Sequence, residues 1–382
     1  MDRYYVYTKE LTVGYDGKPL IRNVAIGVRR GEILTLIGPN GSGKSTILKT
    51  IIQQIRLIAG TVVLDGRDMA GMREREIAKK MSILMTERFQ AELMTCRDVA
   101  ATGRYPYTGR LGLLTKEDDA IVDRAIRTVH AEEFAEQPFL RISDGQRQRI
   151  LLARALCQEP EVIVLDEPTS FLDIKHKLEL LEILKNMVRQ RNVAVILSLH
   201  ELDLAQRISD RIVCVAADRS VRVDSPENIF RDGVIRQLYG IEQGSYNATY
   251  GCVEMERVQG EPKVFVIGGG GSGIPVYRRL QRAGIPFAAG VLQRNDLDYP
   301  VADALAAECF DVMAFAKIGG EVLKNAMERM EEIGSVICCV RSFGETNEGN
   351  RALFERAGAL SILTDADKLL HAQDGESGAS DR

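Results

Sequence analysis

Residues 38–45 read Gly-Pro-Asn-Gly-Ser-Gly-Lys-Ser and decide the fold class of this chain. They match a phosphate-binding loop, in which a glycine and four further residues precede Gly-Lys-Ser. The apolar run 33–37 comes before the loop, and residues 44–54 favour a helix after it, as the pattern requires. A glycine-rich turn with a solvated lysine is the alternative, and eight matching positions in this setting argue against it. The stretch predicts an α/β fold that binds a nucleoside triphosphate.

The loop also predicts what its residues do. Glycines let main-chain N–H groups surround phosphate oxygens at the start of a helix. Lys44 is expected to reach the terminal phosphates, and the Ser45 hydroxyl is expected to ligate Mg²⁺. The other positions predicted to contact ATP within the loop are Gly38, Pro39, Asn40, Gly41, Ser42, Gly43 and Thr46.

Two further apolar runs end in polar residues that suit the same site. Residues 162–165 lead into Asp166 and Glu167, and residues 193–199 lead into His200. Doubly wound sheets place ligands at the carboxyl edge of their strands. Asp166 is therefore predicted to hold Mg²⁺ through water, and Glu167 to polarise the water that attacks the γ-phosphate, with His200 beside it. Alone, the acidic pair would be an ordinary strand end; the phosphate loop upstream favours catalysis.

Composition sets the broad class. The chain has 382 residues, 45% of them hydrophobic, with 50 basic and 54 acidic side chains. This length predicts two or three domains, and the absence of a basic stripe argues against nucleic acid as a partner. Seven scattered cysteines suit free thiols in a reducing compartment. With neither a signal peptide nor a run of about 20 apolar residues, we expect a soluble intracellular protein.

A short polar stretch, Gln259-Gly260-Glu261-Pro262, divides the chain. It predicts a first domain over residues 1–258, a linker over 259–262 and a second α/β domain over 263–371. Residues 372–382 are small, polar and charged, and are expected to be disordered.

The second domain begins with an apolar run, 264–267, and the turn 268–273, which satisfies Gly-x-Gly-x-x-Gly. Further strands are expected at 287–292, 312–315, 336–340 and 360–363, a Rossmann-like succession. Gly268, Gly270 and Gly273 are candidates for a loop that accepts a pyrophosphate or another anion. The second strand ends in Gln293-Arg294-Asn295, without the acid that would hold an NAD ribose, and Asp296 comes late. The sequence therefore predicts a regulatory or scaffold domain without its own catalysis.

Residues 142–149, Ile-Ser-Asp-Gly-Gln-Arg-Gln-Arg, resemble the signature of ATP-binding cassette (ABC) ATPases. Together with the phosphate loop, Asp166-Glu167, residues 170–173 and His200, five motifs stand in the order of that family, over residues 4–258. The resemblance implies a RecA-like core with a helical subdomain, ATP and Mg²⁺ as cofactors, and a head-to-tail dimer of two copies. It further implies roles in trans for Ser143, Gly145 and Gln146, a D-loop role for Asp173, and stacking of Tyr15 on adenine. A tyrosine packed at a strand end is the competing interpretation of Tyr15.

The chain departs from the family pattern at two places. Asp144 replaces the first signature glycine, and an acid near bound polyphosphate costs affinity unless it is paired or points away; we expect its side chain to point away from the phosphates. The glutamine that usually follows the strand at 81–84 is missing. Thr86 stands in its place, with Glu87 and Gln90 nearby, so this loop is expected to keep its coupling role while its Mg²⁺ ligand stays open.

Residues 99–107, with Gly-Arg-Tyr-Pro at 103–106, resemble importers of iron-siderophore, haem and cobalamin. That resemblance implies an ATPase subunit at the cytoplasmic face of the membrane. It would energise a permease that imports a metal chelate and would depend indirectly on an extracytoplasmic substrate-binding protein. A soluble ABC-type ATPase or an importer of another substrate is the alternative; a single cassette without a heptad run favours the transporter.

Overall fold

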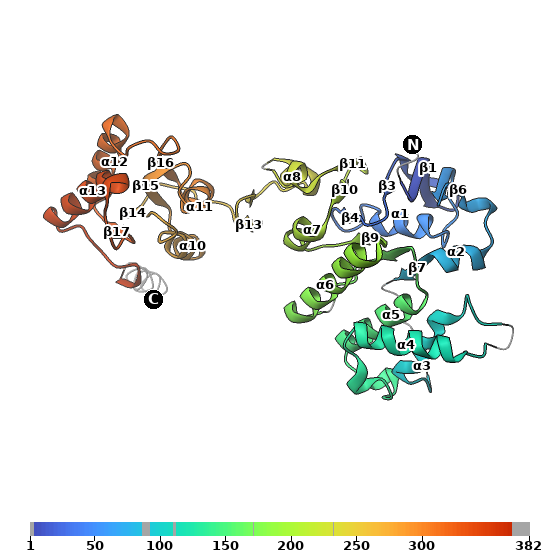
Figure 1. The fold of residues 1–382 in the computed structure, drawn as a ribbon. Coiled ribbons are helices and arrows are strands. Elements are labelled where there is room, and N and C mark those ends of the chain that lie inside the picture. Colours follow the sequence, from blue (N-terminus) through green and yellow to red (C-terminus); the bar gives the residue numbers. More distant parts are fainter. Residues whose placement is uncertain (1–3, 86–91, 110–111, 171, 232, 369–382) are drawn as a thin grey trace, which may run out of the picture. The chain divides into compact units, whose positions relative to one another are not determined.

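The computed structural model describes residues 4–85, 92–109, 112–170, 172–231 and 233–368. Its contacts divide the chain into two compact units, residues 1–240 and 241–382 (Figure 1). The boundary lies earlier than the predicted one at residue 258, because a hairpin of β12 (Ser245–Asn247) and β13 (Cys252–Glu254) packs against the second unit. The Tyr250 hydroxyl donates to the Leu297 carbonyl at 2.7 Å, and Arg278 pairs with Glu254.

The first unit is built on a six-stranded sheet in the order β11-β10-β4-β9-β8-β7. All neighbours pair in parallel except β10 and β11. Its central strands are fully buried, which explains why they read as continuous apolar runs in the sequence. The strands are β4 (Ile33–Ile37), β7 (Met81–Leu84), β8 (Val162–Leu165), β9 (Ala194–Ser198), β10 (Arg211–Val215) and β11 (Val221–Asp224).

An antiparallel sheet shares its core with this parallel sheet. Its strands are β1 (Val6–Tyr15), β2 (Lys18–Val24), β3 (Gly27–Val28), β5 (Ala59–Leu64) and β6 (Arg67–Asp68). The helices around the two sheets are α1 (Lys44–Ile51), α2 (Glu74–Lys80), α6 (Ile174–Arg191), α7 (Leu202–Ile208), α8 (Pro226–Ile229) and α9 (Val234–Tyr239).

Three helices form a separate group in the first unit: α3 (Cys96–Ala101), α4 (Lys116–Thr128) and α5 (Asp144–Cys157). They pack on one another and lie apart from β1 and β6 in Figure 1. Each begins with a capping box, in which the side chain before the helix and one in its first turn satisfy each other's main-chain N–H groups. This group is the helical subdomain that the resemblance implies.

Arg104, in the Gly-Arg-Tyr-Pro segment, holds this helical subdomain together. Its guanidinium is buried and donates to Asp118 Oδ1 at 2.8 Å and to the Cys157 carbonyl at 2.7 Å. The guanidinium also lies 4.0 Å from the centre of the Tyr107 ring. Hydrogen bonds from the main chain and hydroxyl of Thr115, and then from Arg104, lower the pKa of Asp118 to about 2. The segment is therefore a structural tie between α4 and the end of α5.

The second unit has a parallel sheet in the order β16-β15-β14-β17, with hydrophobic clusters on both faces. Its strands are β14 (Val264–Ile267), β15 (Phe287–Gln293), β16 (Glu308–Val312) and β17 (Val336–Cys338). Helices α10 (Ile274–Arg282) and α11 (Tyr299–Leu305) contribute to one cluster, and α12 (Gly320–Ile333) and α13 (Glu348–Ala359) to the other.

Two predicted strands of this unit are wrong. The strand expected at 312–315 forms earlier, at Glu308–Val312, where it pairs with β15. Met313 and Phe315 follow it as exposed loop residues, and Phe315 has a positive φ of 61°. Residues 360–363 form no strand, because the chain turns at Ser361, with φ of 57°, and only Leu363 bridges to Val336.

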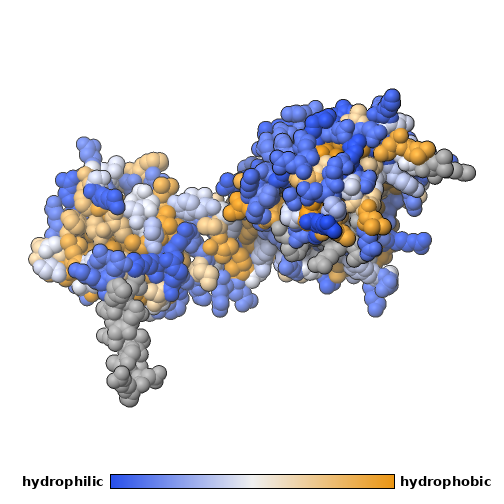
Figure 2. Space-filling model, turned by 90° about the horizontal axis from the view of Figure 1, so that it is seen from below, coloured by the Kyte–Doolittle hydropathy of each residue, from blue (hydrophilic) through white to orange (hydrophobic). Residues whose placement is uncertain are grey.

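Within the described residues, no helix combines the length and the apolar character needed to cross a membrane. The face drawn in Figure 2 carries mostly hydrophilic side chains over the first unit, with hydrophobic groups in small patches.

Replacing Arg104 with alanine should destabilise the first unit by about 3–5 kcal/mol, because it leaves Asp118 charged, buried and unpaired by the guanidinium. Urea unfolding measures the loss, and Arg127→Ala on the exposed face of α4 is the control. Equal stability of the two variants would contradict the structural role of Arg104.

Candidate functional site

Three chain segments meet because their strands are neighbours in the parallel sheet. Strand β9 lies between β4 and β8, with Leu36 paired to Ser198 and Leu197 paired to Leu165. The phosphate loop, His200 and the acidic pair each follow one of these strands at its carboxyl end. The sheet order therefore brings the three predicted motifs to one edge.

The phosphate loop takes a shape that only glycine adopts easily. Gly38, Gly41 and Gly43 have φ values of 150°, 77° and 110°. A Cβ on Gly38 would lie 2.0 Å from the Val215 carbonyl oxygen, so no larger residue fits there without movement of β10. Side chains at these three positions would deform the loop.

Three main-chain donors at the end of this loop are open. In the part of the chain that the structure describes, the N–H groups of Gly43, Lys44 and Ser45 have no acceptor, and no side chain caps α1. The Ser42 hydroxyl is buried and also lacks a hydrogen-bond partner there. Unpaired donors of this kind are the groups that a phosphate would satisfy. The residues thus fit the triphosphate of ATP.

Lys44 lies buried across the loop. Its Nζ donates to the carbonyl oxygens of Gly38 at 2.8 Å and Pro39 at 3.1 Å. Burial lowers the pKa of Lys44, while the charges of Glu167 and Asp166 oppose that shift. The side chain is therefore held over the loop with two carboxylates nearby.

Asp166 and Ser45 offer adjacent oxygen ligands for a hard cation. The Ser45 hydroxyl donates to Asp166 Oδ1 at 3.2 Å, and the Ser198 hydroxyl donates to the same oxygen at 2.7 Å. Mg²⁺ binds a hydroxyl and one carboxylate together with phosphate oxygens and water. The arrangement fits the predicted Mg²⁺ ligands.

Glu167 faces His200 directly: the Glu167 Oε1 to His200 Nε2 distance is 2.5 Å. Its main chain has a positive φ of 48°, and its N–H donates to the Ser198 hydroxyl at 2.8 Å. Ser198 thus fixes both acids, a role that the sequence analysis missed. Its only signal was a hydroxyl residue near the carboxyl end of an apolar run.

Two tyrosines adjoin the loop. Tyr15 ends β1, is 51% exposed and shares a hydrogen bond of 3.1 Å with the Thr46 hydroxyl. Its exposure beside α1 favours the adenine-stacking hypothesis over burial at a strand end. Tyr239 was missed by the sequence analysis; its hydroxyl accepts the Gly38 N–H at 3.2 Å, and burial raises its pKa to about 12.

The signature segment forms the start of α5. Ser143 Oγ accepts the Gln146 N–H at 3.3 Å, and Gln146 Oε1 accepts the Ser143 N–H at 3.0 Å. Asp144 forms an ion pair with Arg147 at 2.9 Å, so its charge is partly balanced within the same helix. The signature helix therefore keeps its capped, electropositive start.

Asp173, the predicted D-loop residue, lies near this start. Its carboxylate caps α6 by accepting the His176 N–H at 2.9 Å. A Cβ on Gly145 would lie 3.6 Å from His176 Nδ1, so the signature and the D-loop are neighbours. Thr86, Glu87 and Gln90 lie outside the described residues.

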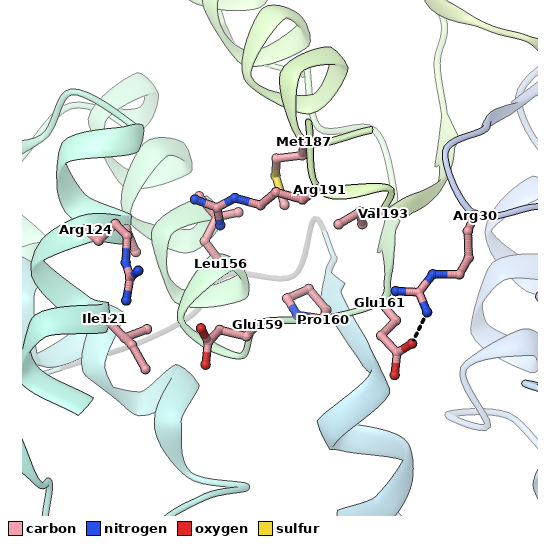
Figure 3. Close-up of a pocket in the computed structure, with 11 residues that line it drawn as sticks. Arg30, Ile121, Arg124, Leu156, Glu159, Pro160, Glu161, Met187, Arg191 and Val193 are labelled. Atoms are coloured by element: carbon pink, nitrogen blue, oxygen red, sulfur yellow. Dashed lines mark hydrogen bonds and ion pairs between the residues drawn. The ribbon is translucent and has the colours of Figure 1, made fainter. Parts of the chain in front are cut away.

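A pocket of about 380 Å³ in the first unit is separate from this site. Its wall includes Glu161 and Val193, which precede β8 and β9, so it lies at the opposite edge of the sheet. Figure 3 shows Arg30 paired with Glu161 and the side chains of Arg124 and Arg191 near the helical subdomain. None of the phosphate-loop residues lines it.

Fold and site together define a P-loop ATPase of the ABC type. The family described as ABC transporter matches residues 21–170, and the MJ0874 family matches residues 287–380. An ABC transporter ATP-binding protein of Methanocaldococcus jannaschii is 40% identical over 274 residues, covering 72% of this chain and 94% of that protein. The chain belongs to the ATP-binding proteins of ABC transporters.

Other relatives differ in how much of the chain they match. A cobalamin import ATP-binding protein of Halobacterium salinarum is 33% identical over 365 residues, covering 94% of this chain and 90% of that protein. An iron(3+)-hydroxamate import ATP-binding protein of Bacillus subtilis is 34% identical and covers 62% of this chain and 87% of that protein. The dimeric structure of an ATP-binding cassette in a post-hydrolysis state, bound to ADP and phosphate, is 26% identical with a TM-score of 0.52, covering 58% of this chain and 98% of that one.

Replacing Lys44 with alanine should weaken ATP binding roughly 10–100-fold, because the charge over the loop is lost while the N–H donors remain. Titration with a fluorescent ATP analogue measures the change. Lys116→Ala, an exposed lysine of α4, should bind as the unchanged chain does. Full affinity in Lys44→Ala would contradict the assigned contact.

Proposed function

We propose that the first unit hydrolyses ATP to energise a separate membrane permease that imports a metal chelate. The observation that carries this proposal is the meeting of an open phosphate loop, a Ser45–Asp166 ligand pair and the Glu167–His200 pair at one sheet edge. Bound Mg²⁺ would neutralise charge on the phosphates, and Ser45 and Asp166 would hold it.

Glu167 is the proposed catalytic base. Its carboxylate would accept a proton from the attacking water, and His200, in contact with Glu167 Oε1, would orient it and touch the γ-phosphate. The Ser198 hydroxyl would position both acids, since it donates to the Asp166 carboxylate and accepts the Glu167 main-chain N–H.

We propose that two copies bind ATP head to tail. The start of α5 carries the positive end of the helix dipole, which suits a phosphate supplied by another copy. Ser143, Gly145 and Gln146 would contact that phosphate, with Asp173 beside them. The related cassette solved as a dimer supports this arrangement.

The proposed cargo is a metal chelate, with a cobalamin-type ligand as the first candidate. The hydroxamate-import relative matches 235 residues, about the length of the first unit alone, whereas the cobalamin-import relative matches 365 residues and therefore extends into both units. A shared second unit favours a shared cargo class. The chain would work at the cytoplasmic face of the membrane, with an extracytoplasmic binding protein delivering the cargo.

Replacing Glu167 with glutamine should preserve ATP binding and lower turnover about 10²–10⁴-fold, because the water loses its proton acceptor. The variant should also accumulate as an ATP-bound dimer, detected by size-exclusion chromatography. Glu182→Gln on the exposed face of α6 is the matched control. Near-normal hydrolysis by Glu167→Gln would refute its assignment as the base.

Coupling to a permease is tested by replacing Thr86, Glu87 and Gln90 with alanine. We expect uptake of labelled cobalamin by cells to fall more than the basal ATPase activity of the purified chain. If one of these residues also contacts Mg²⁺, the Mg²⁺ requirement should rise. Unchanged uptake and an unchanged Mg²⁺ requirement would contradict both roles of this loop, and uptake of a ferric siderophore in place of cobalamin would correct the cargo.

A further inference from the structure

The second unit has its own glycine loop, residues 268–273, between β14 and α10. In parallel α/β folds such a loop is where the pyrophosphate of a dinucleotide binds, through main-chain N–H groups and the start of the helix. Its capacity for a ligand therefore depends on whether those N–H groups are free.

They are not free, because two carboxylates of the same unit accept them. Asp298 Oδ2 accepts the N–H groups of Gly269 at 2.5 Å and Gly273 at 2.9 Å, and its Oδ1 accepts that of Ile274 at 3.2 Å. Both oxygens of Asp296 lie 3.0 Å from the Gly270 nitrogen. Four donors that a phosphate would use are thus taken.

Asp298 is fully buried, and the loop is what stabilises it there. Burial raises the pKa of Asp298, and the N–H groups of Gly273 and Gly269 oppose that shift. Among the described residues neither Asp296 nor Asp298 forms an ion pair, so main-chain N–H groups stabilise both carboxylates. The Asp298 N–H also donates to Asp296 Oδ1 at 2.8 Å, which holds the two acids in register.

The glycines serve packing within the unit. A Cβ on Gly268 would lie 2.1 Å from the Tyr277 hydroxyl oxygen and 2.9 Å from Asp298 Oδ2. A Cβ on Gly273 would lie 2.5 Å from the same hydroxyl. The loop therefore packs closely against Tyr277 and Asp298, and the absence of side chains at Gly268 and Gly273 permits this close contact.

The end of β15 offers no ribose acceptor either. Gln293 donates to the Ala316 carbonyl at 2.7 Å, and Asn295 Oδ1 accepts the Phe315 N–H at 3.0 Å. Arg294 pairs with Asp311 at 2.6 Å. Each side chain in the position of the usual acid is already engaged within the unit.

We infer that Asp296 and Asp298 occupy the phosphate position of this loop, so that the second unit does not bind NAD(P) or another pyrophosphate there. The expected ligand loop of Gly268, Gly270 and Gly273 is instead a cap, which fastens the β15–α11 connection to the start of α10. An incoming phosphate would have to displace two carboxylates and remain beside their charges, with no lysine in the position that Lys44 fills in the first unit.

Hydrogen–deuterium exchange of the full chain, read on peptides within residues 264–282, tests this. In the unchanged chain the loop amides should exchange slowly, and millimolar pyrophosphate or NAD should leave their rates unaltered. In the Asp296→Ala, Asp298→Ala double variant they should exchange about tenfold faster or more, because their acceptors are gone. Pyrophosphate should then restore protection in the variant alone, since the donors are open to it.

Asp303→Ala, an exposed acid of α11, is the control and should exchange as the unchanged chain does. If the double variant fails to fold, Asp296→Ala alone should speed exchange of the Gly270 amide. Slower loop exchange on adding NAD or pyrophosphate to the unchanged chain would overturn the inference. Unaltered loop exchange in the folded variants would overturn it as well.

Discussion

A main-chain N–H group at the start of a helix must find an acceptor, and both units of this chain are organised by that requirement. In the first unit the N–H groups of Gly43, Lys44 and Ser45 have no acceptor among the described residues, and the buried Lys44 side chain lies across the loop. In the second unit the N–H groups of Gly269, Gly270 and Gly273 are satisfied by Asp298 and Asp296. The same strand–glycine loop–helix element thus leads to a ligand site in one case and to a structural cap in the other.

Strand order converts the open loop into a candidate catalytic site. Because β9 lies between β4 and β8, the residue that ends β9, Ser198, can hold Asp166 and Glu167 at once. The positions of these side chains depend on parallel pairing in one register, and a shift of one residue would turn Ser198 to the other face of the sheet. The buried apolar strands that fix this register account for the precision of the site.

The features that could be predicted from the sequence are those formed by contiguous residues. Buried strands such as Ile33–Ile37 and Val264–Ile267 have their predicted bounds, because burial on both faces leaves an unbroken apolar run. The half-buried β16 was misplaced, since the exposed residues after it are more apolar than the strand. Ser198, Tyr239 and Asp298 bind segments 24 or more residues away, and no local sequence pattern marks such contacts.

The β12–β13 hairpin precedes the polar Gly/Pro stretch, yet it is tied to the second unit through Glu254 and Tyr250. A recombination event at that polar stretch would separate the hairpin from Arg278 and Leu297, the residues of the second unit that it contacts. A gene fusion or deletion that keeps the second unit intact would therefore divide the chain after Gly240, so that the hairpin stays with the second unit. In this chain the segment with the composition of a linker, residues 259–262, is not the boundary between the two units.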